Sequence, residues 1–152
     1  MVETIEHNGE ILVIIIGHDH HSPGINFVTP DSFSQQLAYM SHPAGKNIEP
    51  HVHNYCPRQV FINQEVLVIR KGKLRMDLYS GERQYLESRV LTAGDVVLLA
   101  SGGHGFHVIE DVEMIEAKLG PFIGDKDKTR FKPSDLPSDL IAAPVVLKKE
   151  QA

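Results

Sequence analysis

The sequence predicts an all-β domain, built as a barrel or a jelly roll. Three observations support this fold class. Short apolar stretches recur at nearly even spacing, many are rich in β-branched residues, and turns containing Gly, Pro or Asp separate them. Helical periodicity is almost absent from the chain. Many short strands without helices are typical of β-sandwiches and β-barrels.

The first strong element is a strand over residues 11–16, a continuous run of aliphatic, mostly β-branched residues. Such a run predicts a strand that is buried on both faces. A loop is expected over 17–24, because Gly and Pro mark its two ends. The loop carries three histidines but no matching acidic residue in a strand, so we favour a polar surface loop over a metal site: His18, His20 and His21.

His51 and His53 stand one residue apart in a segment that we expect to be a strand. Residues i and i+2 of a strand point to the same face, so the two imidazoles would project side by side. Glu65 opens an alternating strand that is expected to run to Ile69 and to end in a polar turn over 70–73. At the edge of an apolar interior, the Glu65 carboxylate needs a cation or water. A divalent metal held by the two histidines would supply that cation.

The rest of the chain predicts further short strands joined by turns. One segment turns at Gly94 and Asp95, forms an apolar strand over 96–99, turns again at two glycines and reaches His104. Strands are also expected over 25–28, 35–41, 74–79, 84–91, 106–109 and 112–118, with turns at 80–83 and 110–111.

These segments resemble the two signature motifs of the cupin family. The first motif is a glycine, a His-X-His pair, a glutamate and a later glycine, and its counterparts are Gly45, His51, His53, Glu65 and Gly72. The second motif is a Gly-Asp pair, an apolar strand and a turn that leads to a histidine, and its counterparts are Gly94, Asp95, Gly102 and His104. The resemblance covers residues 38–118.

The chain departs from the cupin pattern at two places. Residues 54–63 form an inserted loop between the histidine pair and Glu65, where the family usually has a shorter gap. In the second motif Ala100 stands where proline is usual, and one residue is missing before His104. This second departure leaves His107 as an alternative to His104.

The resemblance implies a cupin-type double-stranded β-helix, or jelly-roll barrel, in a single domain over residues 1–152. Its core would span about 35–122, after N-terminal strands in 1–34 and before a polar tail over 123–152. It also implies one divalent transition metal, since three imidazoles and one carboxylate suit zinc, iron, nickel or manganese. The implied ligands are His51, His53, Glu65 and His104.

The segment 116–131 is similar to the ending of one cupin subgroup, which is associated with bacterial surface-polysaccharide biosynthesis. The shared elements are Glu-X-Lys, Gly-Pro-Phe, Asp-Lys and a later Phe. This similarity implies a tail that packs on the barrel and a small polar ligand, such as a sugar or sugar nucleotide. An isomerase-type enzyme is one interpretation. An oxygen-dependent dioxygenase and a non-catalytic, metal-dependent carbohydrate-binding module are the alternatives, because this barrel hosts many activities.

Further candidate residues surround the expected metal site. His107, Tyr55 and Tyr39 are candidate proton carriers, which the sequence does not rank. Arg58 lies in the inserted loop and is a fixed cation suited to a carboxylate or phosphate of a ligand, although a solvated surface arginine is the more common state. Cys56, in the same loop, is expected to be a packed small hydrophobe rather than a ligand or nucleophile.

Composition excludes several classes of protein. The formal net charge of −5, without a basic stripe, argues against nucleic-acid binding, and a single cysteine excludes a disulfide framework within the chain. The acidic start and the short apolar runs predict no signal peptide and no membrane span, so we expect a reducing, cytoplasmic location. The cupin resemblance also implies a homodimer, in which a second chain would cover the apolar strand over 11–16.

Overall fold

The computed structural model describes residues 1–141, which form an antiparallel six-stranded sheet and a separate two-stranded hairpin. The strands of the sheet are β1 (Val2–His7), β2 (Glu10–Ile16), β5 (Glu65–Tyr79), β6 (Tyr85–Thr92), β7 (Val96–Leu99) and β8 (Gly103–Lys118). The hairpin consists of β3 (Gly24–Phe27) and β4 (Ala38–Ser41). One turn of 3-10 helix, η1 (Gly124–Asp127), is the only helical element of the described residues, so the predicted all-β class is confirmed.

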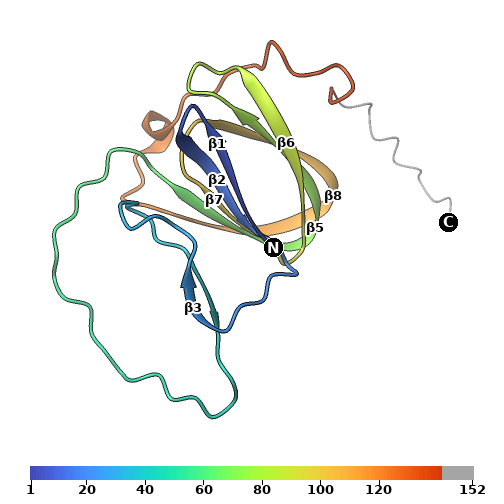
Figure 1. The fold of residues 1–152 in the computed structure, drawn as a ribbon. Coiled ribbons are helices and arrows are strands. Elements are labelled where there is room, and N and C mark those ends of the chain that lie inside the picture. Colours follow the sequence, from blue (N-terminus) through green and yellow to red (C-terminus); the bar gives the residue numbers. More distant parts are fainter. Residues whose placement is uncertain (142–152) are drawn as a thin grey trace, which may run out of the picture.

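Strand β5 organises the sheet, whose order is β1-β2-β7-β5-β6, with β8 also paired to β5. Along one edge, β5 pairs first with β7 and then with β6. Along the other edge it pairs with β8 from end to end, with Glu65 opposite Lys118 and Tyr79 opposite Gly103. Figure 1 shows this sheet as a strongly curled half-barrel. A β-barrel-like fold is therefore supported at this coarse level.

Two turns that the sequence predicts are bends within longer strands. The polar stretch over 70–73 does not end β5, and residues 110–111 do not interrupt β8. Instead, the pairing of β5 with β8 shifts register three times between Ile69 and Leu74. Gly72 has a φ of +80°, and a Cβ atom placed on it would overlap the backbone oxygen of Asp111. A glycine therefore lets the two strands bend together in close contact.

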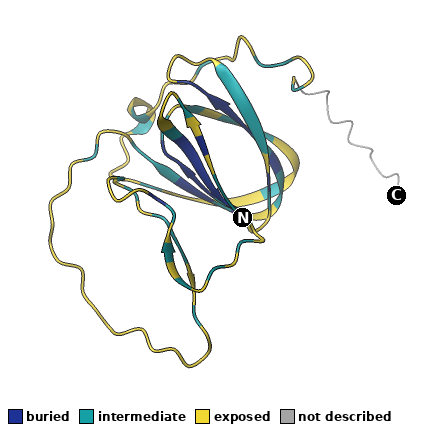
Figure 2. Ribbon diagram, in the orientation of Figure 1, coloured by how far each residue is buried: buried dark blue, intermediate teal, exposed yellow. Residues whose placement is uncertain are grey.

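The main core fills the inner face of the curled sheet. Side chains from β1, β2, β5, β6 and β7 form it, and Leu74, Met76 and Val97 are fully buried within it. A second, smaller cluster lies on the outer face, where Ile14 and Leu98 pack beneath residues of the 28–37 segment. Figure 2 shows the buried residues concentrated on these strands.

Strand β2 is buried on both faces, as predicted. Val13 and Ile15 belong to the main core and Ile14 to the second cluster. Both edges of β2 are paired, with β1 and with β7, and the 28–37 segment covers the outer face. The same chain therefore covers the apolar strand, which does not need the expected cover from a second chain. The main core also includes residues of β1 and β2, which lie before the core of about 35–122 that the resemblance implied.

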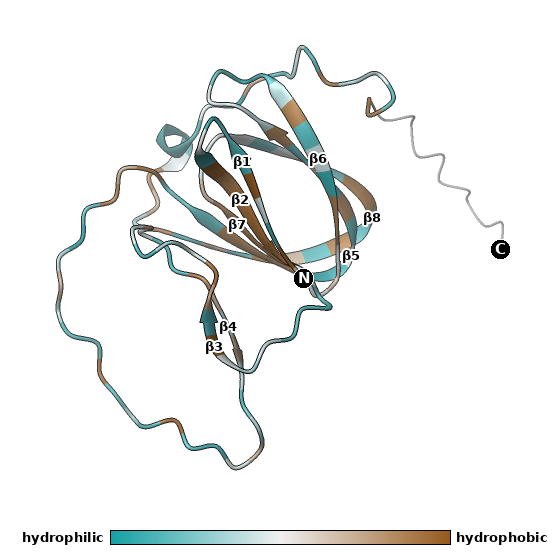
Figure 3. Cartoon of the chain, in the orientation of Figure 1, coloured by the Kyte–Doolittle hydropathy of each residue, from teal (hydrophilic) through white to brown (hydrophobic). Residues whose placement is uncertain are grey.

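The prediction of a strand around His51 and His53 is wrong, because residues 42–64 contain no strand. Figure 1 shows this segment as a wide loop that runs outside the sheet. Pro50 directly precedes the histidine pair and Pro57 follows it, and proline cannot donate a hydrogen bond to a strand ladder. In Figure 3 the loop alternates between hydrophilic and hydrophobic residues, and its apolar side chains are exposed, including Val52, Tyr55 and Phe61.

The described part of the tail, up to residue 141, packs on the sheet. The Phe131 ring lies edge-on to the Tyr79 ring, with 5.2 Å between their centroids. The Asp135 carboxylate accepts a hydrogen bond of 2.8 Å from the backbone N–H of Tyr85. The expected packing of the tail is thus observed over these residues, while positions 142–152 of the expected tail lie outside the described residues. Within residues 1–141, the structure contains no helix that could span a bilayer.

Candidate functional site

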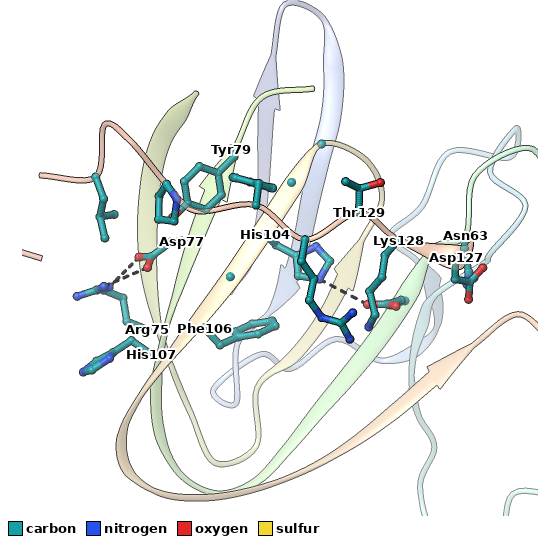
Figure 4. Close-up of a pocket in the computed structure, with 18 of the residues that line it drawn as sticks. Asn63, Arg75, Asp77, Tyr79, His104, Phe106, His107, Asp127, Lys128 and Thr129 are labelled. Atoms are coloured by element: carbon teal, nitrogen blue, oxygen red, sulfur yellow. Dashed lines mark hydrogen bonds and ion pairs between the residues drawn. The ribbon is translucent and has the colours of Figure 1, made fainter. Parts of the chain in front are cut away.

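An open cavity of about 860 Å³ lies beside the start of β8. Its walls come from β5, from the first residues of β8, from the segment that enters β5, and from the tail after η1. Figure 4 shows polar and aromatic side chains gathered around it. Small-molecule sites are commonly concave and roughly 300–1,000 Å³ in volume, so the cavity is large enough for such a ligand.

Glu65 and His104 meet at the wall of this cavity. Glu65 is the first residue of β5 and shares its face with the core residue Leu67, whereas His104 is the second residue of β8. Nε2 of His104 lies 3.5 Å from Oε2 of Glu65. Figure 4 marks this contact as a dashed line from the His104 ring. Their side chains are 32% and 15% exposed, so a ligand in the cavity can reach both.

Lys118 is a second partner of the Glu65 carboxylate, beside the His104 imidazole. Its Nζ lies 3.9 Å from Oε1 of Glu65, 3.5 Å from Glu116 and 4.0 Å from Asp127. Asp127 in turn accepts a hydrogen bond of 3.3 Å from the side-chain amide of Asn63. The cation partner that Glu65 needs is therefore present within the chain. The sequence does not indicate this role of Lys118, because only the register of β5 with β8 places it opposite Glu65.

Hydrogen bonding to His104 is the largest influence on the pKa of Glu65 and lowers it, and the charges of His104, Lys118 and Lys128 act in the same direction. Partial burial opposes them, because it disfavours the charged carboxylate. The balance keeps the Glu65 pKa below its usual value, so the carboxylate is ionised at neutral pH. The site thus holds an anion next to an imidazole and an ammonium group.

The histidine pair of the first motif does not join this cluster. His51 and His53 are exposed in the 42–64 loop, with ring centroids 5.3 Å apart, and neither lines the cavity. Nδ1 of His51 lies 3.2 Å from the backbone oxygen of Glu49. Across residues 1–141, no group of three or more His, Cys, Asp or Glu side chains is placed to hold a metal ion. This arrangement brings two of the four expected ligands together and therefore does not fit the four-ligand centre.

The other candidate residues are spread over the molecule. His107 lines the cavity, but it projects from the face of β8 opposite to that of His104. Tyr55 and Arg58 lie exposed in the 42–64 loop and do not line the cavity. Tyr39 lies on β4, where its hydroxyl is 3.4 Å from Nδ1 of His21. Of the expected proton carriers and ligand-binding groups, only His107 thus lies at the cavity.

Cys56 is exposed in the same loop, so the expectation that it packs as a small hydrophobe is wrong. The expected loop over 17–24 is observed at the surface. Its His18 binds the buried Asp95 carboxylate through the backbone N–H at 2.8 Å and lies 3.1 Å from it through Nδ1. The Gly94 and Asp95 pair therefore forms a structural turn away from the cavity.

A second polar cluster lines the cavity on the other face of β5. Arg75 and Asp77 form a bidentate ion pair there, and Ser88 of β6 donates a hydrogen bond of 2.6 Å to Asp77. The sequence does not single out this cluster, since alternating polar residues are ordinary on a strand with one solvated face. The signal that could have revealed it is the same-face spacing of an arginine and an aspartate two residues apart.

Comparisons of the chain with protein-family models, with curated proteins and with solved structures found no match. The function must therefore be argued from the side chains and the geometry of this cavity.

Proposed function

We propose that the protein binds a small polar molecule in this cavity and transfers a proton on it, as an isomerase-type enzyme does. The observation that carries the proposal is the contact between the ionised Glu65 carboxylate and the His104 imidazole at the wall of an open cavity. A carboxylate that faces one ring nitrogen of a histidine fixes its tautomer and orientation. Nδ1 of His104 is then the atom that exchanges a proton with the substrate.

Lys118 complements this pair. Its ammonium group lines the cavity beside Glu65, and it can donate a hydrogen bond to a substrate oxygen. When a proton leaves a carbon next to a carbonyl group, negative charge develops on that oxygen, and a positioned cation stabilises it. A proton carrier and an oxyanion stabiliser are the two groups that an enolisation needs, and His104 and Lys118 can supply them at this cavity. Enolisation is the central step of many sugar isomerisations.

The substrate class and the barrel type in this proposal come from the cupin resemblance. The curled half-barrel is compatible with a β-barrel, and the cupin-type jelly roll is proposed from the resemblance alone. The polysaccharide-linked ending over 116–131 favours a sugar or sugar nucleotide. Aromatic rings of Phe61, Tyr79, Phe106 and Phe131 line the cavity, and such rings can stack against a sugar face.

Proton exchange in deuterated water tests the proposal directly. Sugars and nucleotide sugars are incubated with the protein, and proton NMR follows the loss of the signal next to the carbonyl group. We expect His104→Gln to slow the exchange by about 100-fold or more, since general acid–base catalysis contributes about that much. Glu116→Gln is the matched control, because Glu116 also contacts Lys118 but does not line the cavity. Equal exchange rates for the wild type and His104→Gln would refute the proposal, and saturable binding without exchange would favour a non-catalytic binding module.

A second candidate is a divalent-metal site, which the cupin resemblance implies. Its supporting observation is that Glu65 and His104, two of the expected ligands, already lie 3.5 Å apart. His51 and His53 could join them only if the 42–64 loop moved onto the cavity. When bound, such a metal would polarise a carbonyl oxygen of the substrate or support an oxygen-dependent reaction. This candidate includes the dioxygenase alternative.

Elemental analysis of the purified protein, followed by titration with zinc, iron(II), nickel and manganese, tests this candidate. A four-ligand site predicts that His51→Ala and His104→Ala each lower the bound metal sharply. Loss of metal with His104→Ala alone would show that the loop takes no part. A protein that takes up none of the four metals would exclude the site.

The homodimer also stays a proposal. The edge of β8 that faces away from β5 pairs with no other strand in the described part of the chain. Apolar side chains are exposed along β8, among them Val108, Ile109 and Ile115. An unpaired edge with apolar side chains is suited to pairing with a second copy. Light scattering that gave the mass of a single chain would contradict this association.

A further inference from the structure

The buried ion pair of Arg75 and Asp77 lies at the part of the cavity away from Glu65 and His104. We infer that Arg75 is the centre of an anion-binding site for a phosphate or carboxylate group. This inference does not depend on the proposed proton transfer, because Arg75 projects from the face of β5 opposite to the one that carries Glu65. Figure 4 shows the two groups of side chains separated by the first residues of β8.

Asp77 holds the Arg75 guanidinium in one orientation. Nε of Arg75 donates to Oδ1 of Asp77 at 2.7 Å, and Nη2 donates to Oδ2 at 3.0 Å. Asp77 is itself fixed by Ser88, whose hydroxyl lies 2.9 Å from that of Tyr85. The Arg75 and Asp77 side chains are only 13% and 7% exposed. The guanidinium is therefore preorganised by a network that is shielded from water.

Arg75 keeps unused donors. A guanidinium carries five N–H groups. Two of them point to Asp77, and no further acceptor contacts Arg75 within residues 1–141. The three that remain include both N–H groups of Nη1, and Arg75 lines the cavity. A planar fork of free donors beside an open cavity is suited to bidentate binding of carboxylate or phosphate oxygens.

The neighbouring strand leaves space for such an anion. In β8, Gly105 stands opposite Asp77 and Gly103 stands opposite Tyr79, so neither position places a side chain over the ion pair, although the Tyr79 and Phe131 side chains lie against Gly103. The next residue on this face is His107, which stands opposite Arg75 and also lines the cavity. Its imidazole can donate a second hydrogen bond to an oxygen that Arg75 holds.

Stability alone does not account for this cluster. Shielding two charges from water is costly, and apolar residues of similar size are often equally stable or better in such positions. The strands around it are already rich in apolar residues that could extend the core. A guanidinium that is preorganised by a carboxylate and left with free donors is instead what recognition of an oxyanion requires.

Titration with inorganic phosphate tests the inference, with sodium acetate as the carboxylate probe and sodium chloride at matched ionic strength as the reference. Two-dimensional NMR of the nitrogen-15-labelled protein follows the Arg75 side chain and the amides of residues 103–107. We expect saturable shifts with phosphate, acetate or both, in the millimolar range, and none with chloride. The oxyanion that binds more tightly identifies the ligand class. No saturable shift with either oxyanion would overturn the inference.

A double variant, Arg75→Gln with Asp77→Asn, removes both charges and leaves no buried carboxylate without a partner. It should weaken the oxyanion affinity at least about 10-fold, which corresponds to 1.4 kcal/mol. Arg89→Gln is the matched control, because Arg89 also binds two carboxylates, those of Glu3 and Glu87, but does not line the cavity. Unchanged affinity in the double variant would refute the site. His107→Ala, which leaves the ion pair intact and removes the imidazole donor, provides a second measurement if the double variant does not fold, and unchanged affinity there would likewise count against the site.

Discussion

Two histidine-bearing regions of this chain have very different structural environments. His104 lies at the start of β8, where backbone pairing with β5 holds it against Glu65. His51 and His53 lie in the 42–64 loop, which has no strand pairing and leaves both side chains exposed. Both regions carry histidines that the sequence motifs predicted as metal ligands. The difference teaches that residue types at the right spacing form a site only where the backbone is held in register with its neighbours.

The largest expected contrast between these regions is in hydrogen exchange. Strand β5 is paired along both edges and carries fully buried core residues, so its amides should exchange only through global unfolding. Amides of the 42–64 loop should exchange about three orders of magnitude faster or more. Mass spectrometry after exchange in deuterated water measures both regions. Slow exchange around His51 and His53 would show that the loop is structured after all.

The next largest effect should come from Gly72. Gly72→Val places a branched side chain at a positive φ and against the Asp111 backbone, so we expect a loss of at least about 3 kcal/mol in unfolding free energy. Gly45→Val is the matched control in the loop, because Gly45 has a similar φ of +83° but no neighbouring atom within 4 Å. Only the dihedral cost of about 1–2 kcal/mol should remain there. Urea unfolding measures both, and equal losses would mean that β5 and β8 do not bend together at Gly72.

A smaller contrast is expected between two methionines. Met76 is 0% exposed in the main core, so Met76→Ala should cost about 2–5 kcal/mol through lost burial and a cavity. Met40, on the hairpin, is 59% exposed, and Met40→Ala should change the unfolding free energy by no more than about 0.5 kcal/mol. Chemical denaturation compares the two variants. A large loss from Met40→Ala would show that the hairpin is covered in solution.

The smallest effect should come from the charge of Glu65. Its pKa is lowered in the folded protein, chiefly by hydrogen bonding to His104, so the ionised carboxylate stabilises the fold above its unfolded pKa. That contribution is lost as the pH falls through the folded pKa. Glu65→Gln should therefore be less stable than the wild type near neutral pH, by less than about 1 kcal/mol because water screens the partly exposed pair. The difference should shrink in acid, and thermal unfolding between neutral and acidic pH measures it.

Much of the strand pattern could be predicted, because it follows from local rules. The β-branched run of β2, the hairpin turn after Tyr79 and the apolar strand β7 are all present close to where the pattern indicated them. The errors are concentrated where local pattern and backbone chemistry conflict. A polar, glycine-containing stretch looked like a turn but bends β5, and an alternating stretch between prolines looked like a strand but is a loop.

Only some residues of the candidate site could be predicted from the sequence. Glu65 and His104 could be proposed from their motifs, and the structure brings them together. Lys118 belongs to the Glu-X-Lys element of the 116–131 segment, but nothing in the sequence places it beside Glu65. Nothing in the sequence around Arg75 distinguishes it from a solvated strand residue. Their roles depend on which strand lies opposite and on which face of the sheet the cavity opens.

The sequence by itself determined the all-β class, the apolar strands and most of the turns, since side-chain period and turn chemistry act over a few residues. Only the tertiary structure decided that Glu65 meets His104 and Lys118, that Arg75 keeps free donors at the cavity, and that the 42–64 loop stays apart. These outcomes depend on strand register across dozens of residues, where a shift of one position would turn each side chain to the other face.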